Sequence, residues 1–164
     1  MKLRRISFGL SLGLYLCVPG ITQAPIQPVL WTGSLTPKTA AGPGKRIDIN
    51  LSADIQEGWH VYGLEQPAGG PTPLRVALDE NGVALTVGAA SGSAPIKKHD
   101  PSFNLETQVY DRSFVLHLPI QVKPHPSAGK QAVSVSVRFQ ACSDRMCLPP
   151  RTVHVSVPIE IAGQ

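Results

Sequence analysis

Two cysteines separated by four residues carry the clearest chemical signal in this 164-residue sequence. Cys142 and Cys147 enclose Ser-Asp-Arg-Met and are followed by Leu148-Pro149-Pro150. Four intervening residues can form a hairpin connection that brings the two sulfurs within bonding distance. The two thiols can then form an intramolecular disulfide, or exchange it with a disulfide of another protein.

Such a bridge has a structural and a redox interpretation, and spacing alone leaves both open. The chain-entropy relation gives about 2 kcal/mol for so short a loop, at the low end for disulfides. An exposed bridge that closes a short loop is more often labile and redox-active. Metal ligation is a third interpretation, but a lone pair of cysteines is not a zinc site. It would need His60, His99 or His154 as further ligands.

The first 24 residues have the three-part pattern of a secretory signal peptide. The start is positively charged, residues 6–18 are apolar, and small or polar residues follow up to Ala24. We therefore predict a signal peptide at residues 1–24 and a periplasmic or secreted protein. After its removal Cys142 and Cys147 are the remaining cysteines, in a compartment where thiols tend to be oxidised.

The charge of the chain comes mostly from that signal. The sequence has 15 Lys and Arg against 11 Asp and Glu, and three of the basic residues lie in residues 1–24, so the remaining balance is 12 minus 11, or +1. With no basic run and few aromatic residues in residues 25–164, nucleic acid is not expected as a partner. No apolar run reaches the roughly 18 residues of a membrane span, which excludes a multi-span transporter.

Alternation of apolar and polar residues with period two dominates residues 25–164, and no stretch has a helical pattern. Segments rich in Gly and Pro separate the alternating stretches. About eight short strands, each with one apolar face, predict a single all-β domain, an immunoglobulin-like antiparallel β-sandwich. Residues 89–105 are expected to form a long loop or an edge strand. The expected strands are residues 29–35, 47–53, 59–64, 74–78, 83–87, 114–122, 133–139 and 153–161.

The same alternation predicts the direction in which Cys142 points. Val133 to Phe139 are apolar at odd positions, so Cys142, at an even position, is expected on the polar face with Arg138 and Gln140. Successive side chains of a strand point to opposite faces. We therefore expect Cys142 to be accessible to solvent rather than buried in the core.

The cysteine segment resembles the N-terminal periplasmic domain of DsbD, the bacterial thiol:disulfide interchange protein. Residues 139–150 match the aromatic-Gln-x-Cys…Cys-x-Pro-Pro signature of that family. Residues 58–62, Gly-Trp-His-Val-Tyr, are similar to its Gly-aromatic-x-x-Tyr strand. Counting back from Tyr110, which matches a family tyrosine that opens the following strand, places Phe103 at the aromatic of the family's cap loop. The resemblance covers essentially all of residues 25–164.

The resemblance implies an immunoglobulin-like domain whose two cysteines shuttle electrons. In the family, this domain accepts reducing equivalents from a membrane-embedded module and a thioredoxin-like domain. It then reduces periplasmic thioredoxin-like oxidoreductases and disulfide isomerases. The present sequence is expected to act as a stand-alone exported domain. Either a separate membrane or thioredoxin-like protein supplies its electrons, or the domain has been put to another use.

Four residues are expected around the cysteine pair. The family pattern implies that Tyr62 packs over the sulfurs and that Phe103 forms a lid. His60 stands where some family members have a tyrosine, and next to a thiol it could favour the thiolate or relay a proton. Arg145 would lower the pKa of a neighbouring cysteine, and Asp144 would oppose it.

The sequence therefore predicts a monomeric periplasmic protein-disulfide reductase component that needs no cofactor. Reduced Cys142 and Cys147 would attack a partner's disulfide, pass through a mixed disulfide and end as an intramolecular bridge. The alternative is a secreted immunoglobulin-like binding module whose disulfide is purely structural. A third hypothesis is a copper or zinc carrier that uses the two thiolates and His60.

Overall fold

The computed structural model describes residues 26–163, so the predicted signal peptide lies outside the described residues. Within them the chain forms strands and no helix, which confirms the all-β prediction. It follows that no helix of residues 26–163 is long and apolar enough to cross a membrane. The strands are β1 (Val29–Thr36), β2 (Arg46–Ile55), β3 (Trp59–Tyr62), β4 (Arg75–Leu78), β5 (Ala84–Thr86), β6 (Ser91–Gly92), β7 (Ile96–Asp100), β8 (Leu105–Tyr110), β9 (Phe114–Val122), β10 (Gly129–Phe139), β11 (Ala141–Ser143) and β12 (Arg151–Ile161).

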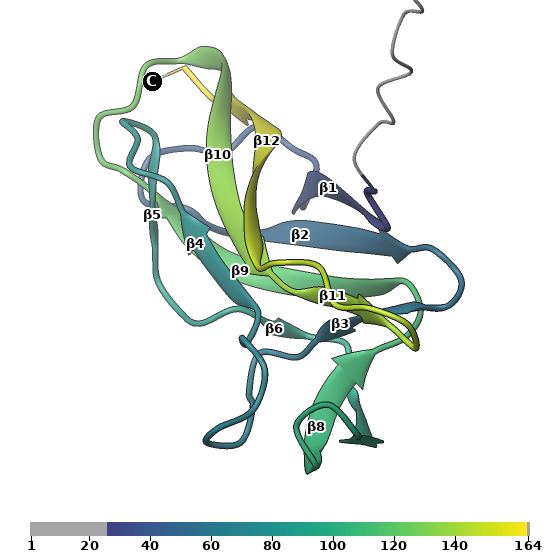
Figure 1. Ribbon diagram of the computed structural model, residues 1–164. Coiled ribbons are helices and arrows are strands. Elements are labelled where there is room, and N and C mark those ends of the chain that lie inside the picture. Colours follow the sequence, from purple (N-terminus) through teal and green to yellow (C-terminus); the bar gives the residue numbers. More distant parts are fainter. Residues whose placement is uncertain (1–25, 164) are drawn as a thin grey trace, which may run out of the picture.

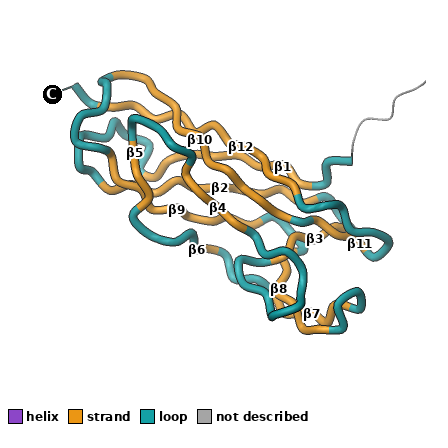
Figure 2. The backbone as a smooth tube through the Cα atoms, turned by 60° about the vertical axis from the view of Figure 1, so that its left-hand side comes forward, coloured by secondary structure: helices purple, strands orange, loops and turns teal. Residues whose placement is uncertain are grey.

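The strands form a sandwich of two layers with a smaller sheet at one end (Figure 1). One layer has the order β1-β2-β9-β5, with β6 also paired to β9, and the other has the order β12-β10-β4. The third sheet has the order β11-β3-β8-β7, and its β7–β8 hairpin projects from the end of the sandwich opposite to β5 (Figure 2). All of these strand pairings are antiparallel. The immunoglobulin-like sandwich is confirmed.

The core lies between the two layers and is built from the apolar face of each alternating strand. Trp31 of β1 joins the layers, because its ring lies 5.5 Å from that of Phe114 in β9 and 5.6 Å from that of Phe139 in β10. At Gly33 the layers come so close that a Cβ atom would lie 2.6 Å from Cγ2 of Val157. Larger side chains at such a position overpack the core.

Each of the eight expected strands corresponds to a strand of the structure, with ends that differ by a few residues. Residues 89–105 were expected to form a long loop or an edge strand. They contain the edge strand β7 and also the two-residue strand β6. The sequence pattern missed β8 and β11. In β8 the polar Thr107 is 1% exposed, so the usual apolar alternation is broken. The three residues of β11 are too few to show any period.

Candidate functional site

The disulfide lies where the chain leaves β10 and crosses to the small sheet. β11 pairs with β3, and the loop after it returns to β12. Cys142 in β11 is bonded to Cys147 in the loop, with an S–S distance of 2.04 Å and a Cα–Cα distance of 4.0 Å. The structure therefore brings the two predicted cysteines together.

Ser143 and Ala141 hold the cysteine loop (residues 143–148) in place through hydrogen bonds. The Ser143 amide donates to the Met146 carbonyl at 2.8 Å, and the Ser143 hydroxyl accepts from the amides of Arg145 and Met146, both at 3.3 Å. The Leu148 amide donates to the Ala141 carbonyl at 2.9 Å. These bonds are local, so the shape of the loop depends little on the disulfide itself.

The two cysteine residues have very different surroundings. Cys142 is only 1% exposed and packs in a small cluster with Tyr62, Val109 and Phe103. Cys147 is exposed on the surface of the loop. A group that approaches from solvent therefore meets Cys147 first.

The expectation that Cys142 is accessible is wrong. The alternation along the strand correctly placed Cys142 on the face opposite to Ala141. Ala141 is paired with Val61 and belongs to the main core. However, that face is not left to solvent, because Phe103, at the tip of the β7–β8 hairpin, packs over it. Alternation along one strand says nothing about a hairpin from elsewhere in the sequence that covers the outer face.

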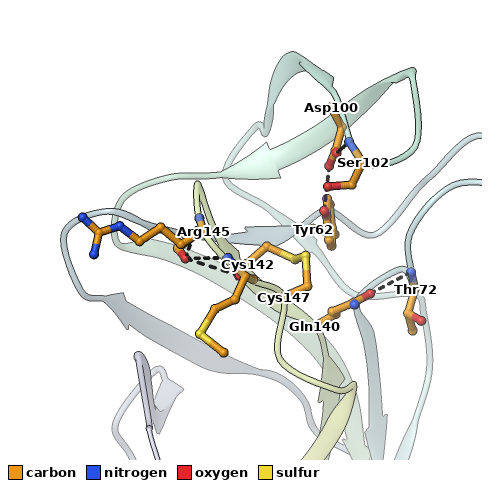
Figure 3. Close-up of a disulfide and its surroundings, with 10 residues drawn as sticks. Tyr62, Thr72, Asp100, Ser102, Gln140, Cys142, Arg145 and Cys147 are labelled. Carbon is orange, nitrogen blue, oxygen red and sulfur yellow. Dashed lines mark hydrogen bonds between the residues drawn. A yellow bond between two sulfur atoms is a disulfide. The ribbon is translucent and has the colours of Figure 1, made fainter.

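The tip of the β7–β8 hairpin is anchored to the site by a buried hydrogen bond. The Tyr62 hydroxyl donates to Oδ2 of Asp100 at 2.6 Å, and the Ser102 amide donates to Oδ1 of Asp100 at 2.9 Å (Figure 3). Tyr62 is 1% exposed and Asp100 7%. The ring of Phe103 meets that of Tyr62 edge-on, with 6.2 Å between centroids. The structure thus brings Tyr62 and Phe103 together with Cys142.

The ionisation of this pair follows from its hydrogen bonds. Burial works to raise the pKa of Asp100, but the bonds from Tyr62 and from the amides of Ser102 and Phe103 outweigh it, and the pKa lies below its ordinary value. Burial and the bond to Asp100 raise the pKa of Tyr62 well above its ordinary value. At neutral pH the bond therefore joins a phenol to a carboxylate, the stronger type of hydrogen bond.

His60 lies directly opposite Cys142 in the pairing of β3 with β11. Its ring contacts that of Tyr62 edge-on, with 5.3 Å between centroids. Burial lowers the pKa of His60, and the positive charge of Lys98 lowers it further, while Asp100 and Asp144 offset part of the shift. The imidazole beside the disulfide is therefore neutral at neutral pH.

A small pocket of about 80 Å³ opens beside the disulfide. Its lining includes both cysteines, His60, Tyr62 and Lys98. This is well below the roughly 300–1,000 Å³ of pockets that hold drug-sized ligands. No group of three or more His, Cys, Asp or Glu side chains within residues 26–163 is arranged to hold a metal ion.

Other residues singled out in the sequence lie further from the sulfurs. Arg145 is exposed, and its guanidinium extends away from the disulfide (Figure 3). His99 lines the pocket, whereas His154 bonds Oδ2 of Asp79 at 2.8 Å and is not part of the lining. Gln140, from the aromatic-Gln motif, accepts a hydrogen bond from the Thr72 amide at 3.3 Å and ties another segment to the start of β11.

Asp100 and Val109 are site residues that sequence reasoning missed. Asp100-Pro-Ser is a typical turn sequence, in which an aspartate accepts from the amide two residues later. That signal predicts the bond from Ser102, but not the bond from Tyr62, which is 38 residues away. Val109 belongs to the unrecognised strand β8.

Together, the fold and the site define a class of protein. It is an immunoglobulin-like β-sandwich with one disulfide whose inner sulfur is covered by a hairpin tip. The chain belongs to the family described as "Thiol:disulfide interchange protein DsbD, N-terminal", whose model matches residues 32–158. The resemblance found in the sequence is confirmed.

Comparison with one solved structure supports the fold. The N-terminal periplasmic domain of ScsB from Proteus mirabilis aligns over 81% of this chain at 17% identity and a TM-score of 0.50. The alignment covers 45% of that structure, so the chain spans less than half of its length. A PapD-like domain of human CEP192 aligns over 94% of this chain and 99% of its own, at 14% identity and a TM-score of 0.38. Among curated proteins, no sequence matches the chain.

Replacing both cysteines by alanine is expected to leave the fold intact. The bridge closes a short loop that is already held by backbone hydrogen bonds, so the free energy of unfolding should fall by about 2 kcal/mol. Alanine avoids placing a hydroxyl in the buried position of Cys142. Urea unfolding followed by circular dichroism measures the change, with the reduced wild-type protein as the control. A double variant that does not fold would show that the disulfide is a structural requirement.

The lowered pKa of His60 predicts a dependence of stability on pH. The unfolded chain binds a proton at His60 near pH 6.5 and the folded protein only at lower pH, so stability is lost as the pH falls below about 6.5. In urea unfolding between pH 7.5 and 5, wild type should lose more stability than His60→Gln, which cannot titrate. The carboxylates with shifted pKa, Asp79 and Asp100, titrate below this range. Equal losses in the two proteins would contradict the prediction.

Proposed function

We propose that this domain passes electrons to other proteins by thiol–disulfide exchange at Cys142 and Cys147. Membership of the DsbD N-terminal family supports a role in thiol–disulfide interchange. The observation that carries the proposal is the unequal exposure of the two cysteine residues, with Cys147 exposed at the surface and Cys142 1% exposed. An exchange reaction needs one sulfur for the partner and another that resolves the intermediate, and a purely structural bridge needs no such difference.

The unequal exposure assigns the roles in the reaction. In the reduced domain, the Cys147 thiolate attacks one sulfur of the partner's disulfide, and the partner's other sulfur leaves as a thiolate. The Cys142 thiolate then attacks the sulfur of Cys147, the mixed disulfide breaks, and the partner leaves as a dithiol. Two electrons and two protons have moved to the partner, and the domain ends with the disulfide seen in the structure. A thioredoxin-like dithiol restores the reduced state by the reverse steps.

His60 is well placed to handle the protons of this cycle. A neutral imidazole can accept the proton of a thiol and so supply the thiolate that reacts. His60 lines the same pocket as both cysteines and lies opposite Cys142. Lys98, in the same lining, adds a positive charge that favours a thiolate. Arg145 points away, so we assign it no part in the activation of the thiols.

The hairpin tip protects the inner sulfur. Phe103 and Tyr62 cover Cys142, and the bond between Tyr62 and Asp100 holds the tip closed. Exchange at Cys142 by unrelated thiols is thereby slowed, because access to a sulfur limits its rate of exchange. The site then reacts through Cys147, whose surroundings a protein partner must match.

The partners that fit this chemistry are periplasmic thioredoxin-like oxidoreductases and disulfide isomerases, with a membrane or thioredoxin-like protein as the electron donor. The predicted signal peptide supports a periplasmic or secreted location, where such partners occur. The reaction involves only cysteine sulfurs and protons, and no cofactor enters it.

Cysteine variants expressed in the periplasm should distinguish the two roles. Cys142→Ala keeps the exposed thiol but lacks the resolving one, so a covalent complex with a discrete oxidoreductase should accumulate. Cys147→Ala keeps only the buried thiol and should trap at least about tenfold less, since access limits exchange. Non-reducing gels, with the double alanine variant as the control, measure the complex. Random adducts of similar amount from both single variants would favour the purely structural disulfide.

Truncating Phe103 should expose the inner sulfur. In Phe103→Ala, dithiothreitol should reduce the disulfide several-fold faster than in wild type, because a second sulfur becomes open to attack. Phe103→Leu keeps an apolar cover and is the matched control, with a rate near that of wild type. The reduction is followed by quenching with a thiol-reactive reagent and mass spectrometry. An unchanged rate together with a large loss of stability would show that Phe103 is a core residue and not a cover.

A further inference from the structure

Met146, the residue before Cys147, has an exposed apolar side chain. Its exposed fraction is 48%, among the largest for apolar residues within residues 26–163. Single exposed apolar side chains are normal on a protein surface, but this one directly precedes the exposed cysteine of the site. The hairpin tip that covers Cys142 leaves Met146 and Cys147 uncovered.

The position of Met146 is fixed although its side chain is exposed. Its amide donates to the Ser143 hydroxyl at 3.3 Å, and its carbonyl accepts from the Ser143 amide at 2.8 Å. On the other side of Cys147, Pro149 and Pro150 are exposed and stiffen the chain. A contact residue on a fixed backbone loses little entropy on binding. The segment from Met146 to Pro150 carries no charge, and its residues form a rigid apolar rim on either side of the exposed Cys147.

The geometry of a mixed disulfide brings a partner onto this rim. In a disulfide the two Cα atoms lie about 4.4–6.8 Å apart, so a protein bonded to Cys147 must place its backbone within reach of the neighbouring side chains. This step rests on the proposed function, in which Cys147 is the sulfur that the partner attacks or binds.

We propose that Met146 is the apolar docking contact for the partner of Cys147. The partner that docks there is a thioredoxin-like protein, which places the uncharged surface next to its own redox-active disulfide against Met146. A flexible thioether packs well against surfaces of different shape, which suits a domain that meets both an electron donor and an electron acceptor. Met146 thereby makes the disulfide react faster with proteins than with small thiols.

The test compares a protein reductant with a small one on the oxidised domain. Reduced thioredoxin is the protein probe, and it gives two electrons and two protons to the disulfide as its own dithiol is oxidised. Dithiothreitol is the small probe. The variants are Met146→Ser, Met146→Leu, and Leu85→Ser as a matched control. Leu85 is 43% exposed and lies in β5, at the far end of the sandwich (Figure 2).

Met146→Ser should lower the second-order rate constant with thioredoxin by about five- to tenfold, the effect of losing a central interface contact. Its rate with dithiothreitol should stay within about twofold of wild type, because access to Cys147 is unchanged. Met146→Leu and Leu85→Ser should behave as wild type with both probes. The ratio of the two rates separates docking from any change in the disulfide itself.

Three results would overturn the inference, and they differ in what they imply for the proposed function. If thioredoxin reduces Met146→Ser and wild type at equal rates, Met146 is no docking contact, and exchange at Cys147 still stands. If thioredoxin does not reduce wild type while dithiothreitol does, both the docking contact and the exchange function are wrong. A parallel fall with both probes would place the effect on the disulfide and also contradict docking.

Discussion

Cys142 and His60 lie opposite each other in the short antiparallel pairing of β11 with β3, and the rest of the site depends on this pairing. It takes the chain out of the β12-β10-β4 sheet directly after Phe139 and carries it to the small sheet at the end of the sandwich. Ala141 stays in the main core, so Cys142 must point to the other face. The pairing therefore gives the inner sulfur a fixed position, and the loop beyond it presents the outer one.

The bond between Tyr62 and Asp100 joins this face to the projecting hairpin. A buried carboxylate is costly unless it is hydrogen-bonded, and here Asp100 accepts bonds from both Tyr62 and Ser102. If the hairpin tip moved away, Tyr62 would lose its partner within an apolar cluster. The closed position is thus the state in which the polar groups are satisfied, and the cover over Cys142 follows from that requirement.

The sequence predicted well what local patterns control. Eight strands follow from alternation, because each has one face in the core, and the spacing of Cys142 and Cys147 predicted a bridge. Family motifs placed Tyr62 and Phe103 near the sulfurs. The burial of Cys142 could not be predicted, since it depends on β7 and β8, whose polar Lys97, Lys98 and Thr107 hide the strand pattern. Contacts between distant segments, such as that of Tyr62 with Asp100, produce no periodic pattern in the sequence.

The unequal burial of Cys142 and Cys147 would let one site be both protected and reactive in the proposed exchange. In that reaction a partner needs access to only one sulfur, because the second step takes place between Cys142 and Cys147 within the domain. The inner sulfur can therefore stay under Phe103 during the first attack. In the proposed reaction the outer sulfur sets the requirements for a partner, which must fit the uncharged segment from Met146 to Pro150. Protection by the hairpin and selection by the loop act on different sulfurs, so each can be changed without the other.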